Sequence, residues 1–122
     1  MIELDFGFAF CTAGIARRDV DKAAGLREIL SQDPGNAFAR YGLAMELAAR
    51  GETEPALEEF GRLLADHPDY TAGYFMAAQT LAKAKRLDEA KERLVEGIEA
   101  ARRTGNKHAL GEMEAMLAEF RE

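Results

Sequence analysis

Residues 47–60 read LAARGETEPALEEF, and residues 81–94 read LAKAKRLDEAKERL. The two stretches begin 34 positions apart, and residues of the same kind recur at Leu47 and Leu81, Ala48 and Ala82, Glu54 and Asp88, Ala56 and Ala90, and Phe60 and Leu94. A period of this size is typical of repeat proteins, because one small unit cannot bury its apolar face alone and a stacked copy covers it. The sequence therefore predicts an array of similar units.

Each unit is predicted to be a pair of helices. A stripe of apolar residues at helical spacing, consisting of Tyr41, Ala44, Leu47 and Ala48, indicates a first helix over residues 36–50, which Gly51 ends. A second helix is expected to run to about Asp66, with the Thr53 side chain as its N-cap and Pro55 in its first turn. Because so short a gap separates the two helices, they are expected to fold back as an antiparallel hairpin.

The chain after Pro68 follows the same plan and ends in one more helix. Apolar positions recur at Tyr74, Ala77, Ala78 and Leu81 in a first helix, and at Leu87, Ala90, Leu94 and Ile98 in a second. Residues 106–121 add an amphipathic helix that we expect to cover the last apolar face, as terminal caps of repeat arrays do. On the exposed faces, i,i+4 ion pairs worth ~0.2–0.5 kcal/mol each are predicted for Glu58–Arg62, Glu89–Arg93 and Glu99–Arg103.

This pattern resembles the tetratricopeptide repeat, whose signature W-x2-L-G-x2-Y…A-x3-F…P has a period of 34 residues. Residues 37–70 and 71–104 are similar to one repeat each. Four residues depart from the signature: Arg40 replaces its tryptophan, Ala77 its leucine, Lys85 the glycine between the helices and Arg102 the final proline. The last two predict a looser turn and a longer second helix. The resemblance implies an all-α fold of antiparallel helical hairpins stacked as a short right-handed solenoid.

The N-terminal part matches this pattern less well. Residues 19–34 resemble the second helix of a partial repeat, so the repeat domain is expected to span residues 19–122. Residues 1–18 form an apolar segment with three alternatives. It is a degenerate first helix completing a third repeat, or a poorly ordered stretch outside the native start, or an extended apolar strip in a groove of its own molecule or of a neighbour.

The resemblance also implies where a partner binds, because the first helix of each hairpin lines the concave surface in this family. Helical spacing then predicts a groove lined by Phe38, Tyr41, Met45, Ala72, Phe75, Met76, Gln79 and Lys83. Aromatic and methionine side chains suit a protein or peptide partner with apolar anchors; packing against neighbouring helices is the alternative role for these side chains. Family members that bind acidic C-terminal tails carry basic residues on this face. Tyr41, Met45 and Met76 stand there instead, which argues against a carboxylate clamp.

Composition excludes several other classes of partner. The net charge of −6 opposes binding to nucleic acid or to an anionic membrane surface. No apolar run approaches the ~20 residues that a membrane helix needs. The single Cys11 fits a reducing compartment, and Glu3 and Asp5 stand where a signal peptide has basic residues, so a cytoplasmic location is expected.

No arrangement of residues indicates catalysis. Cys11, His67 and His108 lack the spacing of metal ligands, and no glycine-rich phosphate loop is present. We therefore expect no enzyme, cofactor or metal site. Basic residues Lys83, Lys85 and Arg86 are expected to offset a helix dipole, with a rim for an acidic partner as the alternative. The predicted function is a protein-interaction adaptor. The alternatives are a homodimer whose groove takes the N-terminal segment or cap helix of another copy, and a non-catalytic structural spacer.

Overall fold

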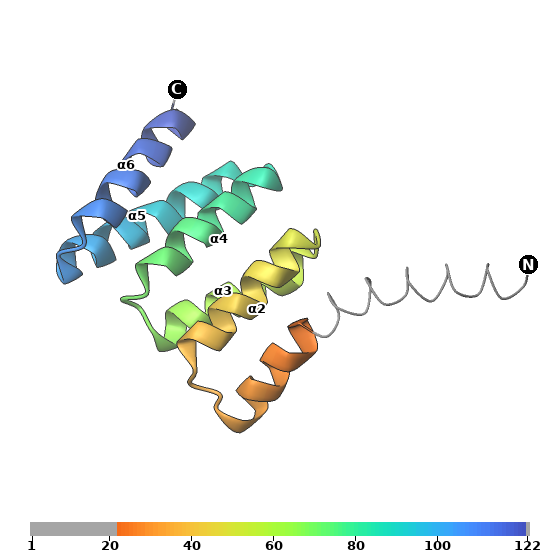
Figure 1. Cartoon of the computed structure of the whole chain (residues 1–122). Helices are drawn as coiled ribbons and strands as arrows, with labels where there is room; N and C mark the ends of the chain where they lie inside the picture. Colours follow the sequence, from red (N-terminus) through yellow and green to blue (C-terminus); the bar gives the residue numbers. More distant parts are fainter. Residues whose placement is uncertain (1–21, 122) are drawn as a thin grey trace, which may run out of the picture.

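The computed structural model describes residues 22–121, which form a stepped array of α-helices (Figure 1). In chain order the elements are a helix over residues 22–32, α2 (Ala37–Ala49), α3 (Thr53–Asp66), α4 (Thr71–Lys83), α5 (Leu87–Thr104) and α6 (Lys107–Arg121). Within this described part there is no strand. The all-α fold of stacked helical hairpins is confirmed. Residues 1–18 lie outside the described residues, so the three alternatives for that segment stay predictions.

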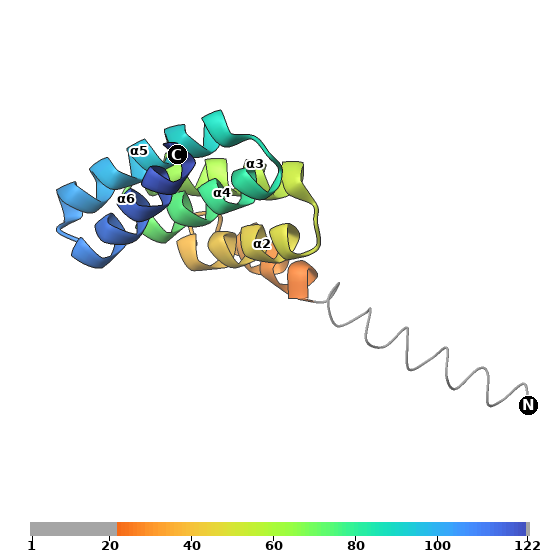
Figure 2. The ribbon, with the colours of Figure 1, turned by 90° about the horizontal axis from the view of Figure 1, so that it is seen from above.

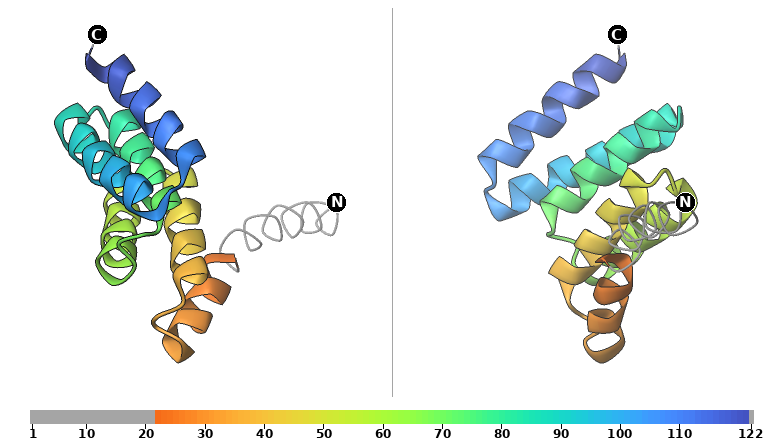
Figure 3. Two further views of the ribbon diagram at one scale, coloured as in Figure 1. Left: turned by 90° about the vertical axis from the view of Figure 1, so that its left-hand side faces the viewer. Right: turned by 45° about the vertical axis from the view of Figure 1, so that its right-hand side comes forward.

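The helices form two rows. From above, α2, α4 and α6 lie in one row and α3 and α5 in the other (Figure 2). Neighbouring elements in the chain pack on each other, and α4 also contacts α2 and α6. Each hairpin is therefore displaced from the preceding one in the same direction. As a result, α6 lies at the opposite end of the array from the helix over residues 22–32 (Figure 3).

Small residues let the two helices of each hairpin approach closely. Ala44 of α2 and Ala56 of α3 are fully buried, as are Ala78 of α4 and Ala90 of α5. The largest fully buried side chains fill the space around these alanines, and they are Leu47, Phe60, Leu63, Leu94 and Met113. Two core clusters result, one centred on α2 and α3 and the other on α4, α5 and α6.

The two hairpin turns are alike, so the predicted looser second turn is wrong. Gly51 has φ +80° and Lys85 has φ +64°, both in the left-handed region. In the first turn the Glu52 N–H donates to Leu47 O at 2.9 Å, and in the second the Arg86 N–H donates to Leu81 O at 2.9 Å. These hydrogen bonds hold Lys85 in the glycine conformation, although a residue with a Cβ atom is less stable there by roughly 1–2 kcal/mol.

The helix ends confirm one expectation and correct another. α5 runs to Thr104 and Gly105 caps it with φ +71°, as the missing proline predicts. The Thr53 side chain is not an N-cap, because α3 begins at Thr53 itself and Glu52 precedes it without a side-chain cap bond. Side-chain caps occur instead at Asn36, which accepts from the Ala39 N–H at 2.9 Å, and at Asn106 before α6.

The predicted i,i+4 ion pairs are wrong. Arg62 lies 3.9 Å from Glu59 and Arg93 lies 3.1 Å from Glu96, both at i,i+3 spacing. Arg103 reaches back to Asp69, in the loop before its own hairpin, at 2.5 Å. The same kind of link between loops occurs at His67, whose Nε2 donates to Gly35 O at 3.0 Å. Each of the last two contacts joins the C-terminal end of a hairpin to the loop that precedes the same hairpin, so His67 has a structural partner.

Candidate functional site

Two adjoining hollows lie on the face formed by α2, α4 and α6. The Met45 hollow, about 280 Å³ in volume, lies between the C-terminal halves of α2 and α4. The Tyr41 hollow, about 250 Å³, lies where α2, the start of α4 and the start of α6 meet. Met76 lines both hollows, so they adjoin at its side chain on α4, and we call the two hollows together the groove.

Most of the residues predicted for the groove meet in these hollows. Met45, Met76, Gln79 and Lys83 line the Met45 hollow, and Tyr41, Ala72, Phe75 and Met76 line the Tyr41 hollow. Phe38 lines neither, and its side chain is 79% exposed. One turn of α2 away from Tyr41, it lies outside both hollows on a more open part of the surface.

The sequence analysis missed the part of the groove that α6 provides. Asn106, His108, Ala109 and Glu112 line the Tyr41 hollow. They were overlooked because α6 was considered only as a cover for α5. A signal was available in the repeat order, since α6 follows α5 as α4 follows α3 and so occupies the row of first helices.

Tyr41 combines a packing role with a groove position. Its ring lies 5.3 Å from that of Tyr70, centroid to centroid, with a tilt of 44°. Both rings are half-buried and pack against the core around α2 and α3. Burial raises the pKa of the Tyr41 phenol, and neighbouring Tyr70 raises it further. Tyr41 is therefore neutral at physiological pH and presents an uncharged aromatic wall to the hollow.

Polar groups in the groove lie mainly at its ends. The Thr80 hydroxyl donates to Met76 O at 2.8 Å and is thereby satisfied within α4. Lys83 is exposed at one end of the groove, and His108 lies 3.2 Å from Glu112 at the other. Among residues 22–121, no group of three or more histidine, cysteine or acidic side chains could hold a metal ion. The arrangement suits recognition of an apolar segment.

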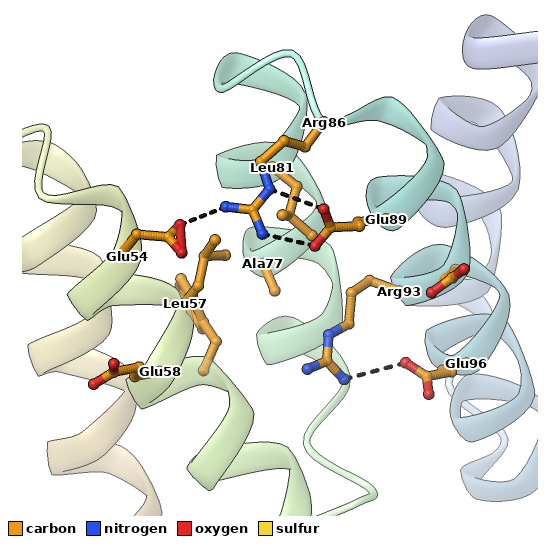
Figure 4. A pocket seen from close by; sticks show the side chains of 11 residues that line it. Glu54, Leu57, Glu58, Ala77, Leu81, Arg86, Glu89, Arg93 and Glu96 are labelled. Atoms are coloured by element: carbon orange, nitrogen blue, oxygen red, sulfur yellow. Dashed lines mark hydrogen bonds and ion pairs between the residues drawn. The ribbon is translucent and has the colours of Figure 1, made fainter.

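A third hollow on the opposite face, about 430 Å³ in volume, is strongly charged (Figure 4). Its guanidinium groups belong to Arg86 and Arg93, and its carboxylates to Glu54, Glu58, Glu89, Glu92 and Glu96. Arg86 binds Glu54 of α3 and Glu89 of α5, so it ties successive second helices together (Figure 4). These bonds raise the pKa of Arg86 and lower that of Glu89. Three of the five carboxylates are ion-paired, Glu54 and Glu89 with Arg86 and Glu96 with Arg93, and the Arg86 pairs join α3 to α5.

Comparison with known proteins identifies the family. A sequence model described as tetratricopeptide repeat matches residues 47–112. A TPR repeat-containing protein of Pseudomonas aeruginosa is 30% identical over 93 residues, which cover 76% of this chain and 89% of that protein. The chain belongs to the tetratricopeptide repeat family. Proteins of this family are in general protein-interaction modules, and the present repeat array is a module of this kind.

Solved tetratricopeptide structures have the same architecture. A tetratricopeptide repeat domain protein from Salinibacter ruber superposes with a TM-score of 0.68 at 30% identity, covering 71% of this chain and 88% of that chain. The type III secretion translocator chaperone SycD of Yersinia enterocolitica gives 0.76 at 18% identity, covering 94% and 79%. PcrH, solved in complex with the chaperone-binding region of PopD, gives 0.78 at 19% identity, covering 97% and 87%. The last two likenesses show the fold alone.

None of the helices in residues 22–121 has both the length and the apolar character required to cross a membrane.

Proposed function

We propose that this tetratricopeptide repeat protein binds an apolar peptide segment of a protein partner in the groove along α4. The observation that carries the proposal is that the Met45 and Tyr41 hollows lie next to each other on one face and share Met76 as a lining residue. Side chains with large carbon surfaces line the groove, while the charged groups lie at its ends. A peptide with apolar side chains would displace water from this surface and gain the associated free energy.

The dimensions of the groove suit a short segment. Ala72 and Lys83 lie near the two ends of the groove on α4, and at a rise of ~1.5 Å per residue they are about 17 Å apart. An extended peptide rises ~3.3 Å per residue, so about five residues would span this distance. Because the helices of the groove are held by the core on their other sides, little ordering of the protein would accompany binding.

The descriptions of two structural neighbours also support a peptide ligand. PcrH was solved with a region of PopD bound, and YrrB, which gives a TM-score of 0.62 at 22% identity, is described as having an unusual peptide-binding site. These descriptions concern those proteins. They support a peptide as the class of ligand here, and the residues proposed to contact it are those of the two hollows.

Three exposed alanines, two in the groove and one outside it, allow peptide binding in the groove to be tested. Ala49 lines the Met45 hollow, Ala72 lines the Tyr41 hollow, and Ala65 of α3 lines neither. A peptide is first selected on the immobilised full chain from a displayed random library, and its affinity is then measured by calorimetry. We expect Ala49→Glu and Ala72→Glu each to weaken binding about tenfold or more, because a carboxylate would be desolvated against the apolar anchor.

Ala65→Glu is the matched control, since it adds the same charge and the same side chain outside the groove. It should change the affinity less than about twofold, in keeping with a substitution far from the contact. If all three variants bound the selected peptide equally well, the groove would not be the binding site. A control that weakened binding as much as the other two would point to the net charge instead.

A further inference from the structure

The helix over residues 22–32 has an open side that its counterparts lack. Ala56, Phe60 and Leu63 of α3 are fully buried, and the residues 34 positions later in α5 are buried as well. The residues 34 positions earlier are Lys22, Leu26 and Ile29. The Lys22 side chain is 68% exposed, and its Nζ lies 3.6 Å from Glu46 Oε1 of α2. Leu26 is half-buried and packs on one side against α2, near Gly42, whereas Ile29 is 45% exposed.

The other side of this helix is closed as expected. Leu30 corresponds to Leu64 of α3 and Ile98 of α5, and all three are buried. Leu30 belongs to the core cluster of α2, and Leu64 to that of α4, so this position faces the next hairpin. The open side is therefore the one on which α3 and α5 pack against the first helix of their own hairpin. We call Lys22, Leu26 and Ile29 the open face.

The register of the array indicates which residues belong there. α2 and α4 are both 13 residues long, and their first and last residues are each 34 positions apart. One further step of 34 towards the N-terminus gives residues 3–15. The turns at 50–52 and 84–86 then correspond to residues 16–18, and the helix over residues 22–32 ends 34 positions before Asp66, the last residue of α3.

A second observation comes from the end of α2. The Nε and Nη2 atoms of Arg50 are buried and have no hydrogen-bond partner among the described residues. The guanidinium is ion-paired at longer range, with Nε 3.6 Å from Glu46 Oε2 and Nη1 3.9 Å from Glu52 Oε2. Successive first helices run parallel, so a helix over residues 3–15 would end beside the C-terminus of α2. The last carbonyls of a helix lack partners within it, and a guanidinium group is a suitable donor to them.

Residues 3–15 have mostly apolar side chains at the positions that are buried in the other first helices. Positions that are buried in both α2 and α4 correspond to Asp5, Ala9, Phe10 and Ala13. Three of these four are apolar. Phe10 is larger than the alanines at its position, Ala44 and Ala78, and Ala13 is smaller than the leucines at its own, Leu47 and Leu81. Asp5 is the exception.

We propose that residues 3–15 of this chain form a helix that docks on the open face of the same molecule and completes a third repeat. This inference is independent of peptide binding in the groove. The docked helix would join the row of first helices formed by α2, α4 and α6.

Two large apolar residues of the segment provide a matched test in the full chain. Phe10 falls at a buried register position, whereas Leu4 corresponds to Phe38 and Ala72, which are both exposed. We expect Phe10→Ser to lower the urea midpoint of unfolding by roughly 1 M and Leu4→Ser to leave it nearly unchanged. Equal shifts for the two variants, or no shift for either, would overturn the proposal.

Ile29→Ser tests the face itself. If the face is covered, this substitution lowers the midpoint, and its effect falls short of additive with that of Phe10→Ser because the two residues share one contact. An open face would make Ile29→Ser nearly neutral and would contradict docking. Sedimentation and the concentration dependence of the midpoint identify the occupant: a monomer with a constant midpoint supports docking within one molecule, whereas a dimer that loses stability on dilution would assign the face to another copy.

Discussion

At Gly97, three helices come so close together that a side chain has no room. A Cβ atom built on Gly97 of α5 would lie 2.6 Å from Tyr74 Cβ of α4 and 2.5 Å from Met113 Sδ of α6. The Tyr74 atom adjoins the backbone and cannot move aside without shifting α4. The glycine therefore sets the distance between α5 and its two neighbours.

Gly97→Ala is accordingly expected to destabilise the protein by up to about 2 kcal/mol, because overpacking outweighs the better helix propensity of alanine. Gly61 of α3 is the control, since a Cβ atom there would meet only Arg93 Nη2 at 3.9 Å. Gly61→Ala should stabilise by up to about 1 kcal/mol. Urea unfolding of both variants measures the two changes in the free energy of unfolding. If Gly97→Ala stabilised the protein as Gly61→Ala does, the three helices would not approach so closely at Gly97.

Lys85 allows a second prediction about a single residue. Its φ of +64° is unfavourable for a residue with a Cβ atom. Lys85→Gly relieves this strain but also gives the unfolded chain more freedom, so the net gain in unfolding free energy should be about 0.5–1 kcal/mol. Lys85→Ala keeps the Cβ atom and serves as the control, with little change expected. If thermal unfolding showed glycine to be no better than alanine, the turn would not hold this conformation in solution.

At the scale of elements, α6 is the helix whose contribution is clearest. It contacts α5 and α4, and it closes the core cluster around them with two buried side chains, Met113 and Leu117. It also forms one wall of the Tyr41 hollow through its first turns. The same helix therefore serves as the terminal cap and as part of the groove, on different faces.

Two methionines of α6 test the cap. Met113 is fully buried, whereas Met116 is half-buried at the edge of the same cluster. Met113→Ala should lower the free energy of unfolding by about 2–5 kcal/mol, as truncation of a buried side chain does, and Met116→Ala by about 1 kcal/mol or less. The comparison is made by chemical denaturation. Similar losses at the two positions would mean that α6 does not pack in this orientation.

At the scale of the whole molecule, stability is expected to vary along the array. α4 contacts α2, α3, α5 and α6, whereas α6 has neighbours on one side only among the described residues. In an array each unit is stabilised by its neighbours, and local opening requires the loss of fewer contacts at an end. Hydrogen exchange followed by NMR should therefore show the slowest amides in α4 and faster exchange in α6. Uniform protection across both helices would indicate that the array opens only as a single unit.

The helices and the period could be predicted from the sequence because they depend on residues close together in the chain. Capping, turn formation and the 3.6-residue period act over a few positions, and the recurrence at 34 residues extends them to the array. For this reason the ends of α2 and α3, the long α5 and the position of α6 agree with expectation to within one or two residues. The stacking of hairpins follows from the same repetition.

Local patterns in the sequence were therefore sufficient to predict the fold and the row of first helices on which most of the proposed groove residues lie. Three features depend on how the helices pack and could not be predicted in this way: Phe38 lies outside both hollows, α6 lines one of them, and Arg103 pairs with Asp69 rather than with Glu99. Periodicity specifies the face of a helix that a residue occupies. It does not specify the distance and angle between helices, and these determine which side chains from separate faces converge.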